Sequence, residues 1–194
     1  MEIESAAPPW LTDEMAQPRI CVSLAERMRY VLDLARRNVL DGTGGPFGAA
    51  VFERESGRLV AAGVNRVEAL KLSCAHAEVL ALSLAQHRLR GYDLGAAGLP
   101  EHALVSSAQP CLVCAGAVLW SGVTELAYAA TKQDVERVLG FDEGFLPRGW
   151  QRRLGRRGVT VRAALLRDEA RSILRLYRER NGTIYGGRKG RERR

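Results

Sequence analysis

Two short motifs constrain this chain more than any other feature of its sequence. In the first, His76 stands two residues before Glu78, and in the second, Pro110 precedes Cys111 and Cys114, which are three residues apart. Structural zinc sites almost always have four histidine or cysteine ligands, whereas catalytic sites have three protein ligands and an open fourth position. These motifs supply three such ligands and one carboxylate. They therefore predict a catalytic Zn²⁺ site with a base beside it.

A structural zinc site is the alternative interpretation of the same residues. It would need a fourth ligand, and the remaining candidates are Cys21, Cys74, His87 and His102. None of them stands at a fitting position in the sequence. Cys74 is the nearest, and we expect it to be a buried loop thiol. The motifs therefore favour the catalytic site.

Length and composition are those of one ordinary globular domain. The chain has 194 residues, of which 46% are hydrophobic and 26% charged, enough to bury a core. No run approaches the ~20 apolar residues of a membrane span, so we expect no membrane partner. The N-terminus is acidic and contains prolines, which is unlike a secretory signal. We therefore expect a cytoplasmic protein whose cysteines bind metal and do not form disulfides.

The net charge of +7 raises the question of a nucleic-acid partner. The excess positive charge, nearly all of it arginine, is gathered in residues 148–157 and 188–194. A solvated basic surface explains such clusters as well as a nucleic-acid footprint does. We therefore favour a small-molecule partner over nucleic acid.

The order of predicted elements indicates an α/β fold, a three-layer α/β/α sandwich around a mixed five-stranded sheet. Apolar spacing and caps predict helices at Ser23–Leu40, Ala75–His87, Cys111–Ser121, Thr131–Leu139 and Asp168–Asn181, the last capped by Asp168. Short apolar runs predict strands at Ala49–Phe52, Leu59–Val64, His102–Ser107, Glu125–Ala130 and Val159–Leu165.

This pattern divides the chain into three parts. Residues 1–20 are expected to form an extended N-terminal arm that could cross onto a partner subunit. Residues 21–187 form the zinc-binding domain, and 188–194 a basic, disordered tail.

Both metal-binding motifs stand where helices are predicted to begin. The N–H groups at a helix start favour the thiolate forms of Cys111 and Cys114. Zinc lowers the pKa of a coordinated water molecule to about 7. Glu78 can then accept a proton from that water and return it to a leaving group. The motifs thus indicate hydrolytic replacement of an amino group on a ring carbon.

Longer motifs extend this pattern. The runs Gly45–Val51, Ala62–Val67, Ala75–Glu78 and Pro110–Trp120 resemble the cytidine deaminase superfamily, whose zinc signature is H-x-E…P-C-x-x-C. Gly140–Gly144 and Asn181–Tyr185 are similar to the guanine deaminase branch. The resemblance implies a cytidine deaminase-like fold, hydrolysis of guanine to xanthine and ammonia in purine catabolism, and a homodimer, often with exchanged termini.

The resemblance also implies roles for individual residues. Asn65 would hydrogen-bond the base, Phe47 would stack on it, and Ala77 would contact it. Glu143 would be a second acidic group near the amine, and Tyr185 would close the pocket. Each has a plainer interpretation: Asn65 as a turn residue, Phe47 and Tyr185 as packing residues, Glu143 as surface. Trp120, at the end of an apolar helix, is expected in the core.

Two departures from the family pattern leave the substrate open. Gln109 stands where the family usually has Glu, and Leu72–Cys74 replace the usual Asp-Pro-Thr. Ammeline or another s-triazine, guanosine and cytosine are alternative substrates. A transfer-RNA adenosine deaminase is another alternative, and a zinc-stabilised interaction domain is the non-enzymatic one.

Overall fold

A five-stranded mixed sheet forms the centre of the protein. The computed structural model describes residues 3–185. The strands β1 (Gly48–Glu53), β2 (Leu59–Val64), β3 (His102–Ala108), β4 (Glu125–Ala130) and β5 (Thr160–Arg162) lie in the order β2-β1-β3-β4-β5. β1 is antiparallel to β2 and β3, whereas β3, β4 and β5 are parallel. The prediction of a mixed five-stranded sheet is confirmed.

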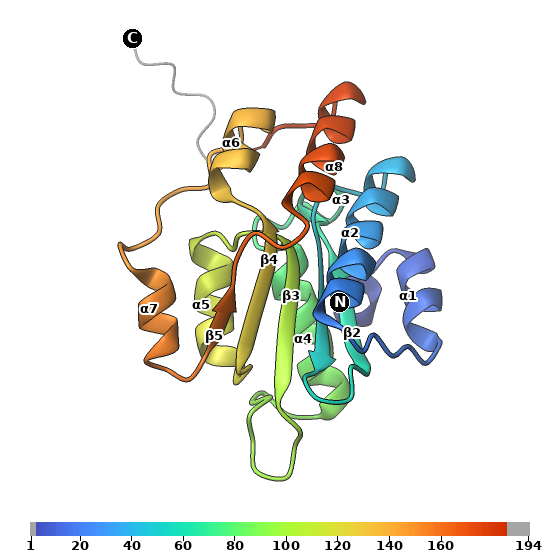
Figure 1. Cartoon of the computed structure of the whole chain (residues 1–194). Helices are drawn as coiled ribbons and strands as arrows, with labels where there is room; N and C mark the ends of the chain where they lie inside the picture. The colour runs from blue at the N-terminus through green and yellow to red at the C-terminus, as the bar shows by residue number, and fades with distance from the viewer. Residues whose placement is uncertain (1–2, 186–194) are drawn as a thin grey trace.

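Helices cover both faces of this sheet (Figure 1). α2 (Leu24–Leu40) and α8 (Arg167–Glu179) lie on one face, and α4 (Ala77–Leu89) and α5 (Leu112–Ser121) on the other. The remaining elements are η1 (Ile3–Ala6), α1 (Pro9–Ala16), α3 (Val67–Leu70), α6 (Lys132–Leu139) and α7 (Trp150–Gly155). The three-layer α/β/α arrangement is therefore confirmed. No helix among residues 3–185 has the length and apolar character needed to cross a membrane.

Local sequence explains where α2 begins. The Glu26 carboxylate accepts a hydrogen bond from the Ser23 N–H at 2.9 Å, and the Ser23 hydroxyl accepts one from the Glu26 N–H at 3.2 Å. This is the predicted capping box, an arrangement in which two donors at a helix start are satisfied reciprocally.

Gly63 brings α4 unusually close to the sheet. A Cβ atom at this position would lie 2.5 Å from the Ala77 carbonyl oxygen and 2.6 Å from the Ala81 nitrogen. Such distances are well inside van der Waals contact, so only glycine allows β2 to pass beneath the first turn of α4. That turn follows His76 and contains Glu78, so the glycine helps to place both.

The N-terminal segment differs from the extended arm that we expected. Residues 9–16 form α1, and Leu11 and Met15 are buried against the sheet. A proline at the first helical position starts a helix well, and apolar residues four apart give that helix one buried face. The expectation of an extended segment was wrong because a short amphipathic helix was overlooked.

Other local expectations were also wrong. α8 begins after Leu166, and Asp168 lies within its first turn, so Asp168 is not the N-cap. Cys74 is exposed, not a buried thiol. Trp120 is 76% exposed. Although α5 is apolar around most of its circumference, the sheet and α4 cover only one side of it, so Trp120 on the other side is left exposed. α3 and α7 were not predicted. The basic tail, 188–194, lies outside the described residues.

Candidate metal centre and adjoining cavity

The predicted zinc ligands lie together at the starts of two neighbouring helices. Cys111 Sγ is 3.6 Å from Cys114 Sγ, and His76 Nδ1 is 3.4 Å from each sulfur. Tetrahedral zinc, with Zn–S of about 2.3 Å and Zn–N of about 2.0 Å, would space these atoms about 3.8 Å (S···S) and about 3.5 Å (S···N) apart. The donor set therefore fits zinc in both chemistry and spacing.

The alternative of a four-ligand structural site finds no support in this geometry. Among the described residues, the metal-binding group consists of His76, Cys111 and Cys114, whose donor atoms all lie within 4.8 Å of one another. Cys21, Cys74, His87 and His102 do not join them. Three ligands with an open fourth position are what a catalytic zinc requires.

The two ligand-bearing helices direct their N-termini at this point. His76 is the N-cap residue of α4 and Cys111 is that of α5. Free N–H groups and the helix dipole at such ends stabilise negative charge. The prediction that both motifs begin helices is confirmed, and the placement favours thiolates at the metal.

The charges of the ligands depend on one another. Burial alone would lower the pKa of His76, but its hydrogen bond to Cys111 and the nearby negative charges outweigh burial and raise that pKa to about 9. The hydrogen bond with Cys114 lowers the pKa of Cys111 to about 4. The same bond, together with burial, raises the pKa of Cys114. A divalent cation between the sulfurs would favour the second thiolate as well.

Glu78 lies beside the ligands and is not one of them. Its Oε2 is 3.3 Å from the Cys114 sulfur, and its Oε1 accepts a hydrogen bond from the Ser106 hydroxyl at 3.1 Å. Burial, followed by the negative charge of Cys111, raises the pKa of this carboxyl. A buried carboxyl with a raised pKa is suited to both taking up and releasing a proton.

Ser106 was not identified from the sequence. It lies on β3, and the strand alternation directs its side chain to the face covered by α4, whereas Ser107 binds the Gly48 N–H instead. Period-two alternation could have separated the two serines, but only the packing of α4 on this face shows which one meets Glu78.

A cavity of about 560 Å³ opens onto the metal centre. It is lined by His76, Glu78, Cys111 and Cys114 and by four of the predicted substrate-binding or catalytic residues, Phe47, Asn65, Glu143 and Tyr185. Segments far apart in the sequence thus meet at one site. Ala77 is fully buried at the start of α4 and is not among the lining residues.

Three aromatic rings line one side of this cavity. Phe141 contacts Phe47 edge to face at a centroid distance of 5.9 Å and Tyr185 at 4.9 Å. Edge-to-face contacts of this kind hold rings in defined orientations. Burial raises the pKa of Tyr185, against a hydrogen bond with Asn65 that lowers it. Phe141 belongs to the Gly140–Gly144 motif, but the sequence did not reveal that its ring contacts both Phe47 and Tyr185.

Glu143 enters the cavity from the loop after α6. Burial, followed by the negative charges of Cys111 and Glu78, raises the pKa of Glu143 to about 7. The Lys132 ammonium donates a hydrogen bond to the carbonyl of the next residue, Gly144. This contact ties the loop that carries Glu143 to the start of α6.

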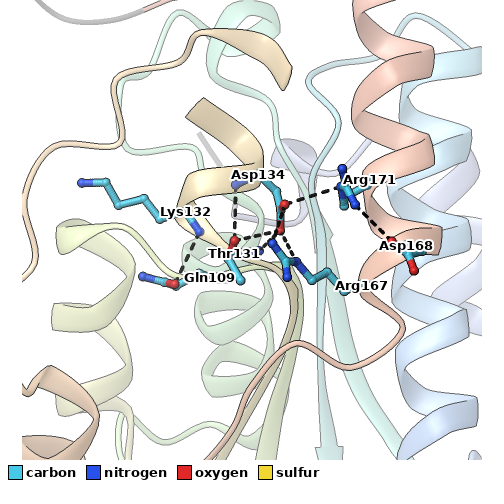
Figure 2. A network of polar contacts seen from close by, with 7 residues as sticks. All are labelled: Gln109, Thr131, Lys132, Asp134, Arg167, Asp168 and Arg171. Carbon is cyan, nitrogen blue, oxygen red and sulfur yellow. Dashed lines mark hydrogen bonds and ion pairs between the residues drawn. The ribbon is translucent and has the colours of Figure 1, made fainter. Parts of the chain in front are cut away.

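Gln109, the departure from the family pattern, also meets the start of α6. Its side-chain oxygen accepts a hydrogen bond from the Lys132 N–H at 3.4 Å, as Figure 2 shows. The residue before Lys132 is Thr131, the N-cap of α6, and its N–H donates a hydrogen bond to the Asp134 carboxylate. That carboxylate also accepts two hydrogen bonds from Arg167 of α8, at 2.7 Å and 2.9 Å. The amide of Gln109 therefore lies in a structural junction at the edge of the cavity.

Comparison with known proteins agrees with this site. Residues 23–130 match the model of the family "Cytidine and deoxycytidylate deaminase zinc-binding region". The chain is 52% identical to the structure of a guanine deaminase from Nitrosomonas europaea, with a TM-score of 0.86, covering 89% of this chain and 93% of that one. It is 53% identical to NE0047 in complex with 2,6-diaminopurine, with a TM-score of 0.87 and coverage of 93% and 95%.

A curated relative is more distant. Guanine deaminase of Bacillus subtilis (strain 168) is 35% identical over 119 residues, which are 61% of this chain and 71% of the relative. The family match includes both zinc-binding motifs and ends at the last residue of β4. The chain therefore belongs to the family of zinc-dependent deaminases that contains the cytidine and deoxycytidylate deaminases.

Proposed function

We propose that this protein is a zinc-dependent guanine deaminase, which hydrolyses guanine to xanthine and ammonia. The observation that carries the proposal is the convergence of three zinc-spaced donors with the buried Glu78 carboxylate, at a cavity lined by Phe47 and Asn65. Its similarity to the Nitrosomonas europaea guanine deaminase over most of both chains supports guanine as the substrate.

The metal and Glu78 would divide the chemistry. Zinc would be held by His76, Cys111 and Cys114 and would supply Lewis acidity, which makes a water molecule nucleophilic at neutral pH. Glu78 would take a proton from water and deliver it to the departing amino group. A C–O bond forms and the exocyclic C–N bond breaks, so one water is consumed for each ammonia released. Ser106 keeps the Glu78 carboxylate oriented.

The remaining cavity residues would recognise the base. We assign to Phe47 the packing of the flat ring, and to Asn65 its hydrogen-bonding, because both line the cavity next to the metal centre. Glu143 would accept a hydrogen bond from an amino group of the base. Tyr185 would close the cavity with Phe141 behind it. Contact between Ala77 and the substrate stays a prediction.

Ammonia release from a panel of substrates tests the proposal. The panel contains guanine, guanosine, ammeline, cytosine, cytidine and adenine, with Glu78→Gln as the control. We expect turnover of guanine above all others, with xanthine as the product. If the protein turned over another ring strongly and did not turn over guanine, the assignment of guanine as substrate would be wrong, whereas the deamination reaction would stand. Inosine formation in transfer RNA, with binding at moderate salt, would favour the RNA alternative instead.

We further propose that the protein forms homodimers through the exposed side of α5. Large apolar side chains are exposed along this helix, namely Leu112, Val113, Leu119 and Trp120. Contiguous exposed apolar residues of this kind mark association surfaces. Leu112 and Val113 also line the cavity, so a second copy placed there would cover its entrance. Exchange of terminal segments, a role in purine catabolism, the cytoplasmic location and the division at residues 20 and 187 stay predictions.

A further inference from the structure

We propose that Asn38 of α2 is a positioning residue that sets the geometry of the base-binding side of the cavity. This inference rests on the proposed function. Asn38 is fully buried and does not line the cavity. It is absent from both zinc-binding motifs, and nothing in its sequence context distinguished it from the other residues of α2.

The Asn38 carboxamide joins the two chain segments that carry the proposed base contacts. Its Nδ2 donates one hydrogen bond to the Gly45 carbonyl at 2.7 Å and another to the Asn65 carbonyl at 3.0 Å. Gly45 is two residues before Phe47. One amide group thus uses both of its N–H bonds to hold the Phe47 segment and the Asn65 backbone at a fixed separation.

The two segments touch each other at this point as well. The Asn65 N–H donates to the Phe47 carbonyl at 2.9 Å. A Cβ atom at Gly44 would lie only 1.9 Å from the Asn65 carbonyl oxygen, and one at Gly45 would lie 3.0 Å from its side-chain oxygen. The segments are therefore packed at a distance that tolerates no side chain between them, and a small displacement of either one moves Phe47 relative to Asn65.

The orientation of the Asn38 amide is itself fixed from the other side. Its Oδ1 accepts a hydrogen bond from the Thr43 hydroxyl at 2.7 Å, and the Thr43 oxygen accepts one from the Trp10 indole at 3.2 Å. If the amide turned over, its oxygen would face two carbonyl oxygens, and both of these would lose a donor. Burial makes such unpaired polar atoms costly, so the chain of contacts allows one orientation.

This arrangement predicts that the hydroxyl of Thr43 affects substrate binding although it lies outside the cavity lining. Thr43→Val removes the donor to Asn38 with little change of shape. We expect the KM for guanine to rise about three- to tenfold, in line with the loss of one buried hydrogen bond, with zinc content unchanged. Thr43→Ser keeps the hydroxyl and is expected to bring the KM back toward the wild-type value.

Asn38→Asp is the direct but harsher test, because it places a carboxyl group against both carbonyl oxygens. Where this variant folds and binds zinc, we expect a larger rise in KM than in Thr43→Val. Ile173→Val, on the buried face of α8, is the stability control: we expect it to lower Tm without changing KM. A structural role alone would make KM follow Tm in all of these variants.

A double-mutant cycle separates positioning from an unrelated loss. In an Asn65→Ala background, Thr43→Val should raise KM by a smaller factor than it does alone, because one of the two contacts that it positions is gone and only that of Phe47 remains. Additive effects of the two changes, or a wild-type KM in Thr43→Val, would overturn the inference. The KM is measured for the ring that the wild type deaminates fastest. If the wild type turns over guanine, only the inference is at stake, whereas inactivity on every ring would remove the proposed function and the inference together.

Discussion

Glu78 Oε2 lies 3.3 Å from the Cys114 sulfur, so the proposed proton carrier and a proposed zinc ligand are in direct contact. A carboxylate in this place adds nothing to a purely structural zinc site. Burial raises its pKa, which suits a group that must alternate between its two protonation states.

Glu78→Gln therefore separates zinc binding from catalysis. The amide keeps the size of the side chain but cannot carry a proton, so we expect kcat to fall about 10²- to 10⁴-fold. Zinc content, measured by atomic emission, should stay at one ion per chain. Glu179→Gln, at an exposed position near the end of α8, serves as the charge-matched control with full activity. Unchanged turnover in Glu78→Gln would contradict the role proposed for Glu78. A wild type that binds zinc but turns over no ring would support the zinc-stabilised interaction domain instead.

Ser106→Ala should weaken catalysis without removing it. The hydroxyl donates to Glu78 Oε1 at 3.1 Å, and losing this bond leaves the carboxylate less well oriented. We expect kcat to fall about tenfold, the usual scale for one buried hydrogen bond. Ser107→Ala makes the same deletion at the next residue of β3, where the hydroxyl binds the Gly48 N–H. Equal losses in the two variants would contradict a specific role for Ser106.

Removal of zinc should abolish activity and lower stability together. The ligands come from the starts of α4 and α5, so an ion bound there ties two helices, and an ion that binds only the folded state stabilises it. We expect dialysis against a chelator to lower Tm and to stop ammonia release, with both restored by one equivalent of zinc. Cys114→Ser should reproduce the loss of zinc. Full activity of the chelated protein would exclude a catalytic metal.

Trp120→Glu tests the proposed dimer surface. Trp120 is 76% exposed on α5, and a charge placed in a dimer interface is costly unless it is paired. We expect light scattering to give a dimeric mass for the wild type and a monomeric mass for the variant. Val22→Glu changes another exposed apolar residue, just before α2 on the other face of the sheet, and should stay dimeric. A monomeric mass for the wild type would contradict the proposed homodimer.

The zinc site could be predicted from the sequence because its determinants are local. Cys111 and Cys114 lie on one helical turn, and the helix start beside His76 follows from the apolar residues of α4. The surroundings were harder to predict, because they depend on which segments meet. Asn38, Ser106 and Phe141 each act across at least 20 residues of sequence, and no local pattern identifies such partners.

The same reason explains the errors. Trp120 was expected in the core because α5 is almost continuously apolar, but a helix on a sheet buries only one side. The N-terminal segment was expected to be extended, although a proline is well tolerated at a helix start. In both cases the outcome depends on the surface against which the helix packs, and a local sequence pattern does not contain that information.

The ion pair between α6 and α8 gives the fold a defined pH dependence. Hydrogen bonds from Arg167 to the Asp134 carboxylate hold the pKa of that carboxyl well below its usual range. The ionised form therefore favours folding. The contribution of the ion pair to the free energy of unfolding is present above the ordinary aspartate pKa of about 3.9. It is lost as the pH falls toward the lower pKa that Asp134 has in the folded state. Arg167→Met should lower the free energy of unfolding at pH 7 only modestly, because the arginine side chain is exposed. In urea unfolding, the difference between wild type and variant should shrink as the pH falls from 5 to about 3. Arg175→Met, on the exposed side of the same helix, should show no such trend, and a difference that grew at low pH would contradict the assignment of the ion pair.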